Sequence, residues 1–142
     1  MNETAVDEKE KPISLVLFSG TDDKLTAAAV LAVGAAVMGR PVNIFLQYYA
    51  LDAFRTASVF ADHGLAPETT SEQATSVRGH KGQHWSELLK QAKDVGEVDI
   101  QACALSMDMY GIGRKDLDPL VDGVEGVAAF MASASEGQVV FI

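Results

Sequence analysis

Short apolar runs that alternate with longer helix-like segments constrain the fold of this chain more than any other feature. Four runs have the length of strands and are mostly apolar, residues 13–18, 42–48, 98–105 and 138–142. Strands buried on both faces of a parallel sheet have this composition. An Ala-rich segment, 23–38, and an amphipathic one, 84–95, separate the first three runs. The alternation predicts an α/β fold in three layers, α/β/α, with a mostly parallel sheet of about five strands.

The remaining segments complete this outline. A helix is expected from Ala50 or Leu51 to about Asp62, with short helices at 114–121 and 127–133 and a short fifth strand near Gly123. Residues 66–83 hold Pro67, Gly79 and Gly82 and are expected to be a long irregular connection. Residues 1–12 are expected to be a disordered acidic tail, and residues 13–142 a single domain.

Charge and cysteine content exclude several classes of function. The net charge is -9, which argues against nucleic acid and anionic membranes as partners, because phosphate binding needs clustered Lys and Arg. No signal-peptide pattern and no apolar run of about 18–20 residues is found, so we expect a soluble, cytoplasmic protein. A single cysteine excludes an internal disulfide and a cysteine-rich metal centre.

The predicted topology says where a site must lie. In an open parallel sheet, ligands bind where the strands end and the loops to the helices begin. The loops that meet there contain Ser19, Gly20 and Thr21, then Tyr48, then the stretch from Cys103 through Ser106 to Asp108. The connection 66–83 should return to this edge and bring His80 and His84 to the side of Cys103.

Cys103 is the candidate residue with the most reactive side chain. It lies near the end of a strand, before a turn that can open a helix, where backbone N–H groups and the helix dipole favour thiolate. A thiolate is the nucleophile that accepts sulfane sulfur. Asp108 opposes this if it lies close, since a carboxylate disfavours a neighbouring anion. The alternative interpretation is a small buried apolar side chain, which is the usual role of a lone cysteine in a strand.

The other candidates have alternatives as well. His80 and His84 have a spacing that can hold a metal on a helix, but Gly82 lies between them and a third ligand is not evident, so no metal is predicted. Free N–H groups at Ser19, Gly20 and Thr21 can hold a small anion, or the loop is a plain tight turn. The loop lacks the full glycine-rich pattern of nucleotide sites, and no cofactor is predicted.

The stretch Cys103-Ala-Leu-Ser-Met-Asp-Met-Tyr-Gly-Ile112 resembles the cysteine segment of the DsrE/DsrF-like family, roughly Cys-x-x-Ser-Met-Asp-x-x-Gly-Ile. Leu17-Phe-Ser-Gly20, Ala35-Ala-Val-Met-Gly39 and the closing stretch from Asp122 to Ile142 also resemble that family. The resemblance implies a flavodoxin-like three-layer fold and oligomers that handle sulfur in the cytoplasm. The acceptor cysteine of the family falls on Cys103. Many relatives have a second cysteine three residues later, where this chain has Ser106.

Two hypotheses follow. In the first, the protein is a sulfur carrier or sulfurtransferase-like protein that loads sulfane sulfur or thiosulfate on Cys103 and passes it to a partner thiol. The resemblance implies a small TusA-like carrier or a rhodanese as partner, and a homo-oligomer. In the second, the protein is a non-catalytic oligomeric subunit or a scaffold that binds a small anion. A third possibility, flavin or nucleotide binding, rests on fold analogy alone. Phe18, Phe45, Tyr48, Tyr49 and the methionines at 107 and 109 are expected to supply an apolar surface for assembly.

Overall fold

Five strands form one parallel sheet in the computed structural model, which describes residues 11–142. The strands are β1 (Ile13–Leu17), β2 (Val42–Leu46), β3 (Val98–Cys103), β4 (Gly123–Glu125) and β5 (Gln138–Phe141). Their order is β4-β3-β2-β1-β5, and all four pairings are parallel. The predicted fold class and the short strand near Gly123 are confirmed. The expected tail, 1–12, lies outside the described residues except for its last two positions.

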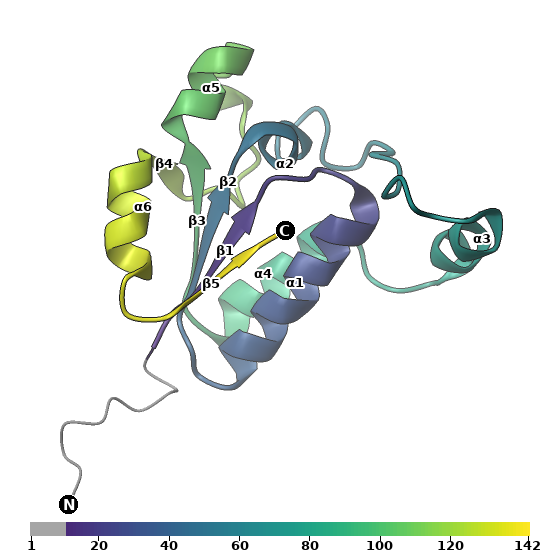
Figure 1. Cartoon of the computed structure of the whole chain (residues 1–142), viewed down its shortest axis with the longest axis horizontal. Coiled ribbons are helices and arrows are strands. Elements are labelled where there is room, and N and C mark those ends of the chain that lie inside the picture. Colours follow the sequence, from purple (N-terminus) through teal and green to yellow (C-terminus); the bar gives the residue numbers. More distant parts are fainter. Residues whose placement is uncertain (1–10) are drawn as a thin grey trace, which may run out of the picture.

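Helices α1 (Asp22–Val37) and α4 (Trp85–Val95) cover one face of the sheet and pack side by side (Figure 1). The buried side of α1 is built mostly from alanines, which let the neighbouring helix and sheet approach closely. Gly96, at the end of α4, shows how close this is: a Cβ at that position would lie 2.9 Å from the Cβ of Ala36. Trp85 begins α4, is 2% exposed and packs its ring on that of Phe54. Burial of each large side chain in this layer contributes roughly 1.5–3 kcal/mol.

Helix α6 (Val127–Ala134) covers the opposite face, so the sheet lies between two helical layers (Figure 1). Phe130 and Ala134 of α6 form a small cluster with Val16, Phe45 and Cys103, one residue from each of three neighbouring strands. The rings of Phe45 and Phe130 stack with centroids 4.6 Å apart. Helix α5 (Ala104–Tyr110) continues directly from β3 at the end of the sheet where all the strands finish, which we call the carboxyl edge.

Three expectations about helices were wrong. The helix expected from residue 50 or 51 to 62 is shorter and begins earlier, as α2 (Tyr48–Ala53), and then gives way to turns. The connection 66–83 is not irregular throughout, because it contains α3 (Ser71–Gly79). Thr70 and Gln73 form a capping box that stabilises α3 locally, although the helix has no buried residue and projects from the body (Figure 1). The helix expected over 114–121 is reduced to a 3-10 turn, η2 (Arg114–Asp116).

Among residues 11–142, no helix combines the length and the apolar character that crossing a bilayer demands.

Candidate functional site

Cys103 is the last residue of β3 and occupies the position just before the first turn of α5. Its side chain is 4% exposed and lies under α6, in the cluster with Val16, Phe45, Phe130 and Ala134. The predicted position at a strand end is therefore present. The thiol is covered by apolar side chains rather than open to solvent, so any reaction at Cys103 requires these side chains to move.

Two of the predicted residues, Tyr48 and Ser106, come together beside Cys103. The hydroxyl of Ser106 is fully buried and accepts a hydrogen bond from the backbone N–H of Tyr48 at 3.1 Å. Tyr48 has φ = 43°, the left-handed region that residues other than glycine rarely adopt. The bond thus joins the start of α5 to a strained turn at the end of the neighbouring strand β2. Such strain persists only where surrounding contacts maintain it, and it is common at functional sites.

The loop of Ser19, Gly20 and Thr21 packs against the same turn. A Cβ on Gly20 would lie 2.3 Å from the carbonyl oxygen of Tyr49, so only glycine fits. The backbone N–H of Ser19, one of the expected anion donors, instead donates to the carbonyl of Ile142 at 3.2 Å. Thr21 occupies the N-cap position of α1 but makes no side-chain capping bond. The Ser19 N–H is therefore already paired within the fold and is not free to hold an anion.

Aromatic side chains gather at the carboxyl edge of β1, β2 and β5. The ring of Phe18 lies 4.7 Å from Tyr48, 5.6 Å from Tyr49 and 5.7 Å from Phe141, measured between centroids. Tyr110, at the end of α5, has a raised pKa because of partial desolvation and, to a smaller extent, electrostatic interactions with Tyr49, Asp52 and Tyr48. Of the expected apolar surface, Phe45 and Met107 are instead buried, while Tyr49 and Met109 are exposed.

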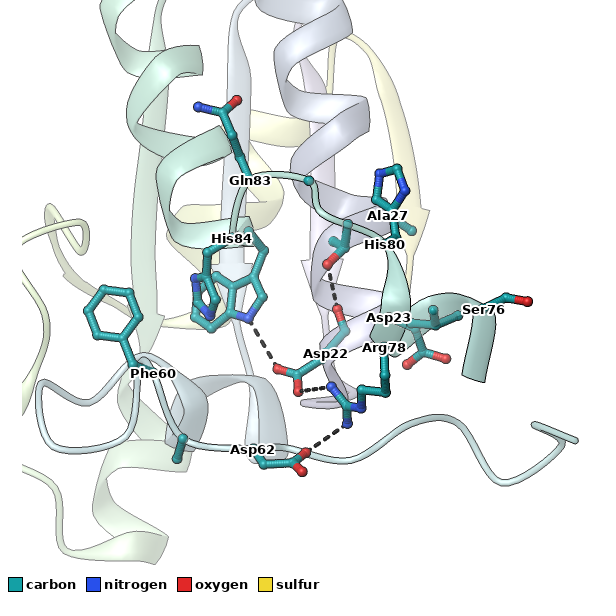
Figure 2. Close-up of a pocket in the computed structure, with 15 residues that line it drawn as sticks. Asp22, Asp23, Ala27, Phe60, Asp62, Ser76, Arg78, His80, Gln83 and His84 are labelled. Atoms are coloured by element: carbon teal, nitrogen blue, oxygen red, sulfur yellow. Dashed lines mark hydrogen bonds and ion pairs between the residues drawn. The ribbon is translucent and has the colours of Figure 1, made fainter. Parts of the chain in front are cut away.

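His80 and His84 belong to a different part of the carboxyl edge. Both line a cleft of about 860 Å³ between α3, the start of α1 and the start of α4 (Figure 2). This cleft lies on the α1 and α4 side of the sheet, whereas Cys103 faces α6. The return of the connection to the carboxyl edge was predicted correctly, but the two histidines and Cys103 lie on opposite faces. Among the described residues, no group of three or more His, Cys, Asp or Glu side chains is placed to hold a metal ion.

His84 has a structural role in this cleft. Its Nδ1 accepts a hydrogen bond from the backbone N–H of Ser86 at 3.1 Å, which caps α4. The centroid of its ring lies 5.0 Å from that of Phe60 (Figure 2) and 4.8 Å from that of Trp85. Desolvation by burial lowers the pKa of His84, and the charges of Asp22 and Glu87 only partly oppose that effect.

Arg78 ties α3 to the body at the mouth of this cleft. Its guanidinium donates to Asp22 at 3.1 Å and to Asp62 at 2.7 Å (Figure 2). Asp22 also accepts from the backbone N–H of His63 and, at 3.4 Å, from the indole of Trp85. Nothing in the sequence spacing joins Asp22 to Arg78, 56 residues away.

Asp108 lies on the exposed side of α5. A residue that the sequence did not single out, Phe130, contributes the helix side of the cluster that covers Cys103. The sequence gives little indication of this contact, because one Phe in a short Ala-rich segment does not reveal which strand residues it will pack against.

A family model described as "DsrE/DsrF/DrsH-like family" matches residues 9–76 and 65–142. The chain belongs to this family. It is similar to the Bacillus subtilis (strain 168) "Uncharacterized protein YrkE", 29% identical over 159 aligned positions that cover 93% of this chain and 96% of the relative. A solved structure of a protein of unknown function, MTH1491 from Methanobacterium thermoautotrophicum, has the same fold. Its TM-score is 0.60 at 15% identity, with 94% of this chain and all of that chain covered. Membership in the DsrE/DsrF/DrsH-like family suggests a role related to sulfur relay.

Proposed function

We propose that this protein is a cytoplasmic sulfur carrier that accepts sulfane sulfur or thiosulfate on Cys103 and passes it to a partner thiol. The observation that carries the proposal is the position of Cys103, at the junction of β3 and α5 in a chain of the DsrE/DsrF/DrsH-like family. Groups at the carboxyl ends of parallel strands are where α/β proteins place their chemistry.

The chemistry needs no oxidant and no cofactor. The Cys103 thiolate attacks the outer sulfur of a donor persulfide, R–S–SH, the donor's S–S bond breaks, and R–S⁻ leaves and takes up the proton lost by Cys103. The product is Cys103–S–SH. Transfer onward is the same exchange in reverse, with a partner thiolate attacking the outer sulfur. Thiosulfate is loaded analogously from tetrathionate, when the thiolate displaces one thiosulfate ion and retains the other as a thiosulfonate.

The apolar cover of Cys103 suits storage rather than rapid turnover. Val16, Phe45 and Phe130 shield the thiol from solvent, and the same cover would protect a persulfide from reaction with small molecules. The absence of a second cysteine means that release depends on the partner's thiol. By family resemblance, we propose a small TusA-like carrier or a rhodanese as that partner.

Assembly into a homo-oligomer is part of the proposal. Large apolar side chains are exposed on three elements: Leu105, Met109 and Tyr110 on α5, Val127 and Met131 on α6, and Val139 and Phe141 on β5. Exposed apolar side chains that form one contiguous patch commonly mark a protein–protein interface. Light scattering should give a mass of two or more subunits, and a monomer mass contradicts this part of the proposal.

Cold cyanolysis after incubation with an alkyl persulfide tests the carrier function. Wild type should release thiocyanate corresponding to about one labile sulfur per subunit, since there is one thiol to load, and Cys103→Ser should release none. Equal release from both proteins refutes the proposal.

A second candidate is a non-catalytic oligomeric subunit or scaffold. The near-complete burial of Cys103 favours it, because a thiol that never becomes accessible cannot exchange sulfur. The two candidates differ in one property of the native protein: a carrier's Cys103 is alkylated without unfolding, and a scaffold's is not.

A further inference from the structure

Glu125 lies beside Cys103 on the neighbouring strand. Strands β3 and β4 pair in parallel with Cys103 opposite Glu125 and, one step back, Ala102 opposite Val124. Adjacent strands are about 4.8 Å apart, and successive side chains point to opposite faces. Ala102 and Val124 pack in the core on the α1 and α4 side, so Cys103 and Glu125 both face α6.

Few other charged groups share this face with Glu125. Asp99 of β3 lies on it, and the amide of Gln101 donates to the Asp99 carboxylate at 3.0 and 3.2 Å. Helix α6, which packs over the face, has no titratable side chain between Val127 and Ala134. Asp108 and Tyr110 of α5 are exposed. Within the described residues, the charge next to Cys103 is therefore that of Glu125, and no cation from these elements offsets it.

We propose that Glu125 sets the specificity of the sulfur site by repelling anionic donors from Cys103, so that the site takes sulfur from neutral persulfides in preference to inorganic sulfur anions. This inference rests on the proposed carrier function and narrows it. Persulfide sulfur is then the group that Cys103 carries, whereas thiosulfate, a dianion, is loaded poorly. A carboxylate about 6 Å from the reacting sulfur disfavours a singly charged reagent by about tenfold to a hundredfold at an effective dielectric constant near 20.

The protonation state of Glu125 gives this selectivity a pH dependence. Its pKa is raised by burial and, to a smaller extent, by the charge of Asp99. Acidification therefore neutralises Glu125 at a higher pH than an ordinary glutamate and admits anions to the site. Removing the charge of Asp99 should move this change to lower pH.

Two reagents of nearly equal size test the proposal. Iodoacetamide is neutral and iodoacetate is anionic, and both alkylate the thiolate. For native Cys103 at pH 7, the rate of alkylation by iodoacetamide is divided by the rate of alkylation by iodoacetate. This ratio is then normalised by dividing it by the same ratio for the chain unfolded in urea. Wild type should give a normalised ratio of about ten or more, and Glu125→Gln a ratio near one. Glu125→Ala provides the same loss of charge if the Gln variant fails to fold.

Glu87→Gln is the matched control, because it changes the net charge equally but lies on α4, on the opposite face. It should keep the wild-type ratio. In wild type the ratio should fall on acidification, and in Asp99→Asn that fall should occur at lower pH. A wild-type ratio near one, or an equal change in the Glu125 and Glu87 variants, overturns the inference. If Cys103 loads sulfur from an alkyl persulfide but shows no charge selectivity, only the role of Glu125 is refuted. If native Cys103 is inert to both alkylating reagents and to the persulfide, the carrier function is refuted as well.

Discussion

Replacement of Phe130 by alanine should both destabilise the fold and uncover Cys103. Phe130 is 1% exposed and stacks on Phe45 at 4.6 Å with an angle of 13° between the rings. A buried Phe→Ala change costs about 3–5 kcal/mol, of which the aromatic pair accounts for about 0.5–1.5 kcal/mol. Typical domains of this kind have 5–15 kcal/mol of stability, so the variant should be folded but clearly weakened.

The adjacent residue provides the control. Met131 lies on the same helix but is 54% exposed in the single subunit, so Met131→Ala should change the unfolding free energy by only about 0.5 kcal/mol when the variants are compared at a concentration too low for assembly. Urea unfolding followed by circular dichroism measures both values. Native alkylation of Cys103 by iodoacetamide should be faster in Phe130→Ala than in Met131→Ala. If Phe130→Ala does not fold, Phe130→Leu gives a smaller effect in the same direction. Equal stabilities for the Phe130 and Met131 variants would show that α6 does not pack on the sheet as described.

Three further outcomes are expected. Ser106→Ala removes the acceptor of the Tyr48 N–H and should lower the free energy of unfolding in urea by about 1–2 kcal/mol. Ser133→Ala, on the exposed side of α6, should change it little. Equal losses in the two variants would contradict the role of this hydrogen bond. Arg78→Met should leave global stability nearly unchanged, because the ion pairs of Arg78 are exposed, but it should speed hydrogen exchange in α3. Unchanged exchange there would show that Arg78 does not hold the helix. Burial lowers the pKa of His84 in the folded state, so its contribution to stability should decline as pH falls below the unfolded value of about 6.5. His84→Asn retains an N-cap for α4 and should remove the decline in unfolding free energy that His84 causes at low pH. An unaltered pH profile would contradict this role of His84.

Local patterns were sufficient to predict the sheet and its main helices. The apolar runs at Ile13–Leu17, Val42–Leu46 and Val98–Cys103 are short, which is typical of buried parallel strands rather than of helices. The Ala-rich segment predicted α1 to within one residue at each end, because Gly39, with φ = 80°, ends the helix in the conformation that glycine allows.

Features that depend on contacts distant in sequence were not predictable. Helix α3 has no apolar face, since it buries nothing, and so it lacks the periodicity by which helices are found. The separation of His84 from Cys103 follows from which face of the sheet each residue contacts, and element order along the chain does not specify that. Glu125 was missed for a similar reason. Its importance comes from the β3–β4 register, which a strand of three residues, the first of them a glycine, does not reveal.

The most direct test of the central claim is intact mass spectrometry of wild type and Cys103→Ser after incubation with an alkyl persulfide and, separately, with tetrathionate. The account predicts the addition of one sulfur mass to wild type with the persulfide, much less addition of thiosulfate from tetrathionate, and no addition of either kind to Cys103→Ser. An unmodified wild-type mass with both reagents would contradict the account and leave Cys103 as an inert buried side chain.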